Sequence, residues 1–178
     1  MPNPRLSYEE SCGVLRERGY LDASDVPKMA NRRPQADDSE FLGVRFYRTF
    51  VGEGEKLEDL TLPRTFFGRT EINDASFKNT DLTESYLCWN DFVNVDFSDA
   101  VLARSEMRAS QYENVRFVRT DLRGADMRLS DYDGCRFDDA LMDGAVLTHD
   151  QREQIELSDA QQAVIDWRDE DGPEPDGG

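Results

Sequence analysis

Hydrophobic residues recur at every fifth position through the middle of this chain, and this period constrains the fold more than any other feature. All nineteen positions of the row are hydrophobic: Leu57, Leu62, Phe67, Ile72, Phe77, Leu82, Leu87, Phe92, Phe97, Leu102, Met107, Tyr112, Phe117, Leu122, Met127, Tyr132, Phe137, Met142 and Leu147. Because hydrophobic residues make up only 38% of the chain, chance does not explain the run. A period of five fits neither an amphipathic helix nor an ordinary strand.

A second row, of small or β-branched residues, runs two positions before the hydrophobic row. Its members are Thr65, Thr70, Ala75, Thr80, Ser85, Asn90, Val95, Ala100, Ser105, Ser110, Val115, Thr120, Ala125, Ser130, Cys135, Ala140 and Ala145. Only Asn90 departs from the pattern. A chain that turned by about 90° every five residues would point both rows inward, so the segment predicts a solenoid with four-sided coils.

Residues twenty positions apart are chemically alike, which supports four sides per coil. The four columns are Phe77, Phe97, Phe117, Phe137; Leu62, Leu82, Leu102, Leu122, Met142; Ile72, Phe92, Tyr112, Tyr132; and Phe67, Leu87, Met107, Met127, Leu147. Each coil of a solenoid must fill the same cross-section as the coil beneath it, so like residues should stack on like.

The repeat resembles that of the pentapeptide-repeat family, whose pattern is a small residue, a polar residue, Leu or Phe, and two variable residues. The runs that carry the resemblance are TDLTE at 80–84, SDAVLAR at 98–104, TDLRGADMRL at 120–129 and DDALMDGAVL at 138–147. The resemblance implies a mainly-β fold, a right-handed quadrilateral β-helix with four pentapeptides per coil. Residues 57–147 would then make about four and a half coils, with α-helical caps at both ends.

Residues 1–56 lack the repeat and are predicted to form a cap of helix, loop and strand. Ser7 with Glu10 resembles a capping box that starts a helix ending near Tyr20. The strand is expected over Phe41–Val51, where one side would carry Leu42, Val44, Phe46, Arg48 and Phe50. Packing on the first coil is the main interpretation, and a partner-binding appendage is the alternative.

Residues 148–168 are predicted to form two capping helices, which start at Thr148 and Ser158. Such a lid would cover the unpaired backbone groups at an open solenoid end. Trp167 is the candidate contact if the protein forms a homodimer through this end, as some members of the family do; otherwise we expect a monomer. Residues 169–178 are acidic and rich in Gly and Pro, and are predicted to be a disordered tail.

The overall charge restricts the partners that the chain can bind. It has 38 acidic and 21 basic residues and a net charge of −17, which disfavours direct contact with nucleic acid or anionic lipid. No signal peptide or membrane span is expected. The three cysteines show no metal-ligand or disulfide spacing, and we expect a bacterial cytoplasmic protein.

The sequence contains no motif that indicates an enzyme, a cofactor or a metal site. The one histidine, His149, lies beside a predicted helix cap, without a nucleophile motif near it. Cys135 is expected to pack inward and Cys88 to lie on the surface. Asp131 and Asp133 lack the glycine-rich context of calcium-binding β-rolls, so we interpret them as solvated. We therefore predict no catalytic activity.

Charge is unevenly distributed among the four predicted faces. One face carries six acids and no Lys or Arg: Glu71, Asp74, Asp91, Glu113, Asp131 and Asp133. A cluster of large apolar residues, Phe66, Tyr86 and Trp89, is predicted to point outward beside it. Exposed aromatic residues bordered by charge are typical of protein-binding hot spots. Alternatively, the N-terminal cap covers these three residues.

Together these features predict a non-enzymatic protein inhibitor, an acidic rod that occupies a basic, nucleic-acid-binding surface of a partner. The first hypothesis is an immunity protein that neutralises a toxin nuclease. The resemblance suggests a second, since the family includes inhibitors and protectors of DNA gyrase or topoisomerase that mimic DNA. A third is a structural scaffold or adaptor whose acidity only keeps it soluble.

Overall fold

The structure is a computed structural model that describes residues 2–22, 27–35 and 43–175. It contains three helices and nine short strands within these ranges. In chain order they are α1 (Tyr8–Glu17), β1 (Arg45–Tyr47), β2 (Phe50–Val51), β3 (Phe66–Gly68), β4 (Glu71–Asn73), β5 (Asp91–Val93), β6 (Gln111–Glu113), β7 (Asp131–Asp133), β8 (Val146–Thr148), α2 (His149–Arg152), α3 (Asp159–Val164) and β9 (Asp166–Arg168).

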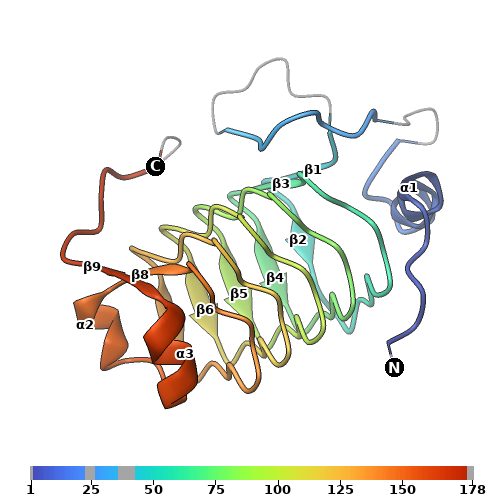
Figure 1. Ribbon diagram of the computed structural model, residues 1–178. Coiled ribbons are helices and arrows are strands. Elements are labelled where there is room, and N and C mark those ends of the chain that lie inside the picture. The colour runs from blue at the N-terminus through green and yellow to red at the C-terminus, as the bar shows by residue number, and fades with distance from the viewer. Residues whose placement is uncertain (1, 23–26, 36–42, 176–178) are drawn as a thin grey trace.

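The repeat segment winds into stacked coils (Figure 1), and residues twenty positions apart pair on successive coils. On one side β2, β4, β5, β6 and β7 form a parallel sheet in which Glu71 pairs with Asp91, and Asp91 with Gln111. Bridges join residues twenty apart on the other three sides, for example Ser76 with Asp96 and Thr61 with Asp81. The predicted mainly-β, four-sided helix is confirmed.

The stack has about six turns, so the predicted four and a half coils were too few. One side shows the full height, because its pairs run from Arg45 through Phe66 and onward in steps of twenty to Asp166. The first coil escaped the sequence period because β1 and β3 pair at an offset of 21 residues. The last strand, β9, pairs with β8 at the usual offset of twenty residues. Helices α2 and α3 lie between the two strands, so the five-residue row of hydrophobic positions is interrupted in the sequence.

The hydrophobic row forms the core of the solenoid. All nineteen of its residues are buried. The Phe column is stacked, with ring centroids of Phe77 and Phe97 at 5.3 Å, Phe97 and Phe117 at 5.6 Å, and Phe117 and Phe137 at 5.0 Å. Tyr112 stacks at 4.8 Å on both Phe92 and Tyr132. Each column is therefore continuous through the coils, as the sequence predicts.

The row of small residues links neighbouring coils by side-chain hydrogen bonds. The hydroxyls of Thr80, Thr120 and Ser130 each donate to a carbonyl 23 residues earlier, at 2.6 to 2.7 Å. Asn90 makes the same bond, because its Nδ2 donates to the Phe67 carbonyl at 2.9 Å and also to Cys88. The one exception in the sequence pattern thus performs the same task with an amide.

The chain turns each corner through a residue with positive φ. From 59 to 144 every fifth residue adopts this left-handed conformation. Gly, Asn and Asp adopt it readily, whereas bulky residues do so at a cost in strain. Trp89 and Leu129 are bulky residues at such corners, with φ of 64° and 61°.

Helix α1 covers the first coil. The predicted capping box of Ser7 and Glu10 is present, and Cys12 and Leu15 of the helix are buried in the core. The strand predicted over Phe41–Val51 is instead two strands, since Arg48 turns a corner at a φ of 49°. That corner moves Val51 inward and leaves Phe50 half exposed; Leu42 lies outside the described residues.

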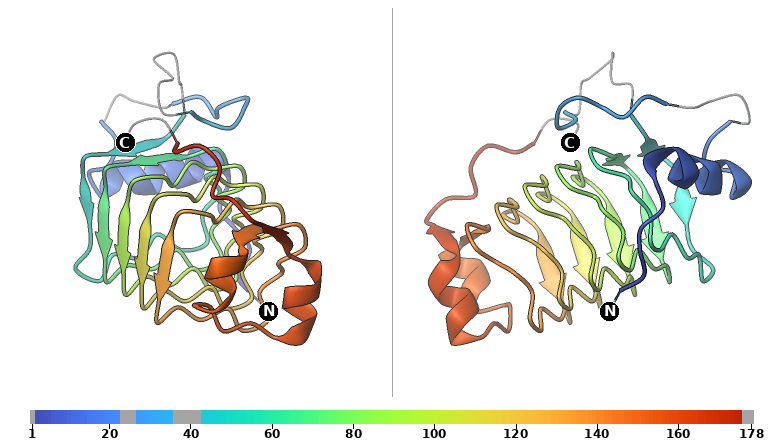
Figure 2. Two further views of the ribbon diagram at one scale, coloured as in Figure 1. Left: turned by 90° about the vertical axis from the view of Figure 1, so that its left-hand side faces the viewer. Right: turned by 45° about the vertical axis from the view of Figure 1, so that its right-hand side comes forward.

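Helices α2 and α3 cover the opposite end, shown in red in Figure 2. Both predicted capping boxes, at Thr148 and Ser158, are present. Their glutamines also reach the last coil: Gln151 donates to the carbonyls of 127 and 130, and Gln161 to those of 137 and 140. The two helices thus satisfy acceptors that an open end would leave unpaired. None of the described helices is long and apolar enough to cross a bilayer.

Candidate protein-binding faces

The six predicted acids lie together on one side of the solenoid, which we call the acidic face. Its residues are Glu71, Asp74, Asp91, Glu113, Asp131 and Asp133, and all six are exposed. Five stand on the outward side of β4 to β7, and Asp74 occupies the adjoining corner at a φ of 54°. The repeat brings them together because outward residues twenty apart stack on successive coils.

These acids form two columns across the parallel strands. Glu71 is paired with Asp91 in one column, and Glu113 with Asp133 in the other. Neighbouring strands lie about 4.8 Å apart, so like charges stand directly beside each other. Between the columns the surface has a shallow hollow of about 400 Å³, whose lining includes Val93. The face therefore offers regularly spaced carboxylates around a partly apolar depression.

None of the six acids forms an ion pair with any residue that the structure describes. Several acids on the other sides are paired, as Asp99 is with Arg119 at 2.8 Å and Asp121 with Arg123 at 2.7 Å. The Arg119 guanidinium bonded to Asp99 holds the pKa of that carboxyl below its usual value. The acidic face thus differs from the rest of the coils in lacking local neutralisation.

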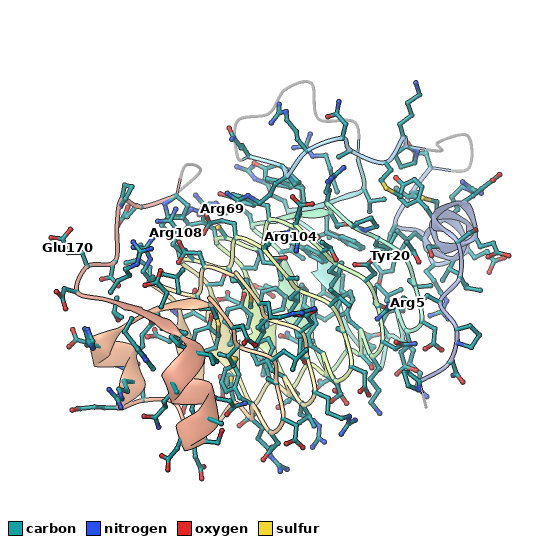
Figure 3. All side chains as sticks on the ribbon, in the orientation of Figure 1. Arg5, Tyr20, Arg69, Arg104, Arg108 and Glu170 are labelled. Carbon is teal, nitrogen blue, oxygen red and sulfur yellow. The ribbon has the colours of Figure 1, made fainter. Side chains whose placement is uncertain are left out.

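The neighbouring side carries the predicted aromatic cluster, and we call it the arginine face. It comprises the outward residues of 66–69, 86–89, 106–109 and 126–129, among them Arg69, Arg108 and Arg128. Figure 3 shows Arg69 and Arg108 on this side, with Glu170 of the C-terminal segment at the end nearer Arg108. Asn90 lies at the edge between this face and the acidic face.

Of the two alternatives for Phe66 and Tyr86, an exposed cluster or one covered by the N-terminal region, the structure supports the covered one. Both point away from the coil interior but are only 5% exposed, stacked on each other with centroids 5.1 Å apart. The N-terminal region contributes to the cover, since Arg45 lies over the Phe66 ring at 5.1 Å and the Tyr47 ring is tilted against it with centroids 6.3 Å apart. Trp89 is partly buried against this cluster. Of the three aromatic residues, Trp89 alone keeps a partly exposed side chain that could contact a partner.

Cys88 also differs from the expectation. It was predicted to be a surface residue, but it is fully buried between the coil and the aromatic rings of Phe66 and Tyr86. Burial raises the pKa of its thiol far above the ordinary value. Cys135 is partly buried on the inward row, and burial raises the pKa of its thiol to about 11. Neither thiol is poised to act as a nucleophile.

Trp167, the candidate dimer contact, continues an inward column of the solenoid. It pairs with Leu147 in register, and its Nε1 donates to the Gln162 carbonyl at 2.9 Å. Its ring stacks on His149 with centroids 6.2 Å apart, and Arg152 lies over it at 5.4 Å. Trp167 is partly buried by these contacts. A role in dimerisation stays a prediction.

Within the described ranges, no three His, Cys, Asp or Glu side chains are grouped so that they could hold a metal ion. The features that the chain does offer are an unneutralised acidic face and a neighbouring covered face, both on a rigid repeat.

The fold and the repeat define a class, the β-helices built from five-residue repeats. Residues 91–128 match the sequence profile of the pentapeptide repeats in eight copies. This segment is a run of pentapeptide repeats, and the resemblance noted in the sequence is confirmed. A comparison with curated proteins gave no match.

Several solved structures are similar to this chain. HetL, a pentapeptide repeat protein involved in heterocyst differentiation regulation in the cyanobacterium Nostoc, is 18% identical over 60% of this chain and 42% of its own, with a TM-score of 0.47. A pentapeptide repeat protein of the Arabidopsis thaliana thylakoid lumen is 22% identical over 64% of this chain and 72% of its own, also at 0.47. QnrB1, a plasmid-mediated fluoroquinolone resistance protein, is 12% identical over 70% of this chain and 94% of its own, at 0.31. The match to HetL thus spans less than half of HetL's length.

Proposed function

We propose that this chain is a non-enzymatic inhibitor that binds a basic, nucleic-acid-binding surface of a protein partner through the acidic face. Its first candidate role is that of an immunity protein that neutralises a toxin nuclease in the bacterial cytoplasm. The observation that carries the proposal is a face with six exposed acids and no ion pair to any described residue, whereas the other faces carry acid–arginine pairs such as Asp99 with Arg119 and Asp121 with Arg123.

Unpaired like charges on adjacent strands lower stability, and neutralisation by a basic partner removes this repulsion. Glu71 beside Asp91 and Glu113 beside Asp133 are two such pairs. The coil spacing of about 4.8 Å places carboxylates at regular intervals along a rigid surface. Such an array complements a groove lined with Lys and Arg, and complementary charge accelerates association and selects the partner.

The test begins with capture of partners from a nuclease-treated lysate of the source organism. The bait is either the wild-type chain or a variant with Asp91→Lys and Asp131→Lys. We expect the wild-type chain to retain a basic protein that duplex DNA displaces, and the variant to lose it. A matched control, Asp139→Lys with Asp143→Lys, changes the net charge equally on other faces and should retain the partner.

Two enzyme assays then separate the roles. Inhibition of DNA cleavage by the captured protein supports nuclease immunity. Inhibition of gyrase supercoiling, or protection of gyrase from a fluoroquinolone, at micromolar protein replaces immunity with the topoisomerase role. Capture that the acidic-face variant and the control variant lose equally, or that duplex DNA does not displace, contradicts the proposed surface and leaves the scaffold role.

A further inference from the structure

The C-terminal segment runs along the arginine face and is held there by side chains of three successive coils. Arg128 Nη1 donates to the Glu170 carbonyl at 3.1 Å, Arg108 Nη1 to the Pro173 carbonyl at 2.6 Å, and Trp89 Nε1 to the Pro175 carbonyl at 3.1 Å. Figure 1 shows this segment, in red, passing from β9 back along the side of the coils. Pro175 is buried at the end of the path.

The donors are fixed in place by the coils and not by the segment. Arg108 Nε donates to Glu106 at 2.7 Å, and Arg128 donates through Nε and Nη2 to Asp126 at 3.0 and 2.8 Å. Arg69 lies over the Trp89 ring at 5.5 Å. Each guanidinium is thus oriented by an acid two residues earlier and directs its remaining N–H groups outward. A preorganised donor loses little freedom when it binds a ligand.

The covered arginines differ from others with the same local pairing. Arg123 pairs with Asp121 as Arg128 pairs with Asp126, yet the exposed fraction of its side chain is 56%, compared with 15% for Arg128 and 12% for Arg108. Gly172 allows the backbone of the tail to approach the Arg128 guanidinium closely. Its φ is +74°, and a Cβ there would lie 3.1 Å from Arg128 Nη1.

Recognition uses the backbone of an extended, proline-containing segment. All three acceptors are main-chain carbonyls, two of them on prolines. Aromatic side chains that accept Pro-rich peptides are a recurring recognition mode, and the acids of the tail carry charge opposite to that of the arginines, although the arginines donate to its backbone carbonyls. The coil corner also holds Trp89 in a left-handed conformation, at a φ of 64°.

We propose that Trp89, Arg108 and Arg128 form a docking track for an extended, acidic, proline-containing segment of a partner protein, and that residues 170–175 are its built-in occupant. Beyond β9, residues 169–175 make no backbone–backbone hydrogen bond to the parts of the chain that the structure describes. The entropy of ordering six residues opposes the three side-chain bonds. Because the tail is tethered beside the track, a partner segment of the same chemistry displaces it only when it binds more tightly or is present at high concentration. This track is separate from the acidic face and does not depend on the proposed inhibitor role.

The test uses the full-length chain and a fluorescent peptide with the sequence of residues 169–178. Gly172→Val should release the tail without substituting any coil residue, because a β-branched residue is strained at that φ and its Cβ would crowd the Arg128 guanidinium in the docked tail. We expect fluorescence anisotropy to show at least about tenfold tighter binding of the peptide to Gly172→Val than to the wild-type chain, whose track is filled. A peptide with both prolines replaced by serine should bind several-fold more weakly.

Three further variants in the Gly172→Val background locate the site. Arg108→Gln should abolish peptide binding, Trp89→Phe should weaken it while keeping the ring, and Arg123→Gln, which removes the same charge from another face, should leave it unchanged. Trp89→Phe keeps the test decisive if Arg108→Gln fails to fold. No binding to Gly172→Val, equal binding to the wild-type chain, or an equal loss with Arg123→Gln would overturn the proposal.

Discussion

The acidic face and the arginine face are neighbouring sides of the same coils, yet the charged side chains are exposed and without ion pairs to described residues on the first, and mostly paired and covered on the second. On the acidic face six carboxylates stand exposed without a cation. On the arginine face Arg108 and Arg128 are bonded to Glu106 and Asp126 and then covered by the tail. The acidic face is formed by the parallel strands β4 to β7 and the arginine face mostly by single bridges, but both repeat every twenty residues, so the outward side chains and the tail account for the difference in charge. The core specifies the rod, and the outward residues specify what each face can bind.

The largest effect is expected from a substitution in the hydrophobic core, on which both faces are built. Phe117→Ala should lower the free energy of unfolding by about 3–5 kcal/mol, because it empties a site stacked between Phe97 and Phe137. Urea denaturation measures the change. Phe50→Ala, at a ring that is 50% exposed, should cost less than about 1 kcal/mol. Similar losses for the two would contradict the stacked core.

Asn90 lies at the edge between the two faces, and its side-chain hydrogen bonds should stabilise the fold there. Asn90→Ala leaves the carbonyls of Phe67 and Cys88 without this donor and should cost about 1–3 kcal/mol. Asn90→Ser should recover part of the loss, since Ser110 in the same row donates to the carbonyl 23 residues earlier. Thermal or urea unfolding compares the two variants; equal destabilisation would show that the bond to Phe67 is not what Asn90 supplies.

Neutralising an acid on the arginine face should be destabilising. Asp126→Asn removes a carboxylate that accepts two hydrogen bonds from the Arg128 guanidinium and one from the Arg128 backbone N–H, and that also lies 3.7 Å from Arg108. We expect a loss of about 1–2 kcal/mol in the free energy of unfolding, since hydrogen bonds to charged groups are the stronger ones. If urea denaturation shows no loss, the ordering of the arginines by this carboxylate is refuted.

Paired acids outside the two faces should show an acid-dependent contribution. Arg119 lowers the pKa of Asp99, so the pair stabilises the fold fully above the unfolded pKa of about 3.9 and loses this as the pH falls through the lower folded value. At neutral pH Asp99→Asn should cost about 0.5 kcal/mol, as is usual for exposed pairs. Denaturation at a series of pH values should show the difference from the wild-type chain shrinking toward pH 2. A difference independent of pH would contradict the pairing.

The smallest effect has the opposite sign and lies on the acidic face. Glu113→Gln relieves repulsion from Asp133 and should raise the free energy of unfolding by about 0.3 kcal/mol. Gln111→Glu is the reverse experiment, because Gln111 separates Asp91 from Asp131 in their column. It should lower stability by a similar amount. Stabilisation by Gln111→Glu, measured at low salt, would contradict the repulsion.

The core was predictable from the sequence because its rule is local and repeated. The row containing Phe97 follows a strict period, so its burial and the stacking of like residues follow from counting. The capping boxes at Ser7, Thr148 and Ser158 were predictable for the same reason, as each depends on two residues three positions apart.

The features that the sequence did not predict arise from a change in the pairing offset and from contacts between segments that are far apart in the chain. The first coil was missed because it contains one extra residue, so that β1 pairs with β3 at an offset of 21 residues instead of 20. The burial of Phe66 depends on Arg45 and Tyr47, which precede the five-residue row, and Cys88 is buried in the cluster that Phe66 and Tyr86 form. The contact of Trp89 with Pro175 joins residues 86 positions apart, and no periodicity encodes it. The positions of the six acids on one face followed from the repeat, whereas their lack of ion pairs required the structure.

The most direct test of the acidic face is the affinity for the purified captured partner, measured by calorimetry for three chains. Asp91→Lys with Asp131→Lys should weaken binding by at least about 100-fold, because removal and reversal of charge act against the same basic surface. Asp139→Lys with Asp143→Lys should stay within about twofold of the wild-type chain, since rim or distant charges contribute little. Equal weakening by the two pairs would show that overall charge, and not the acidic face, binds the partner.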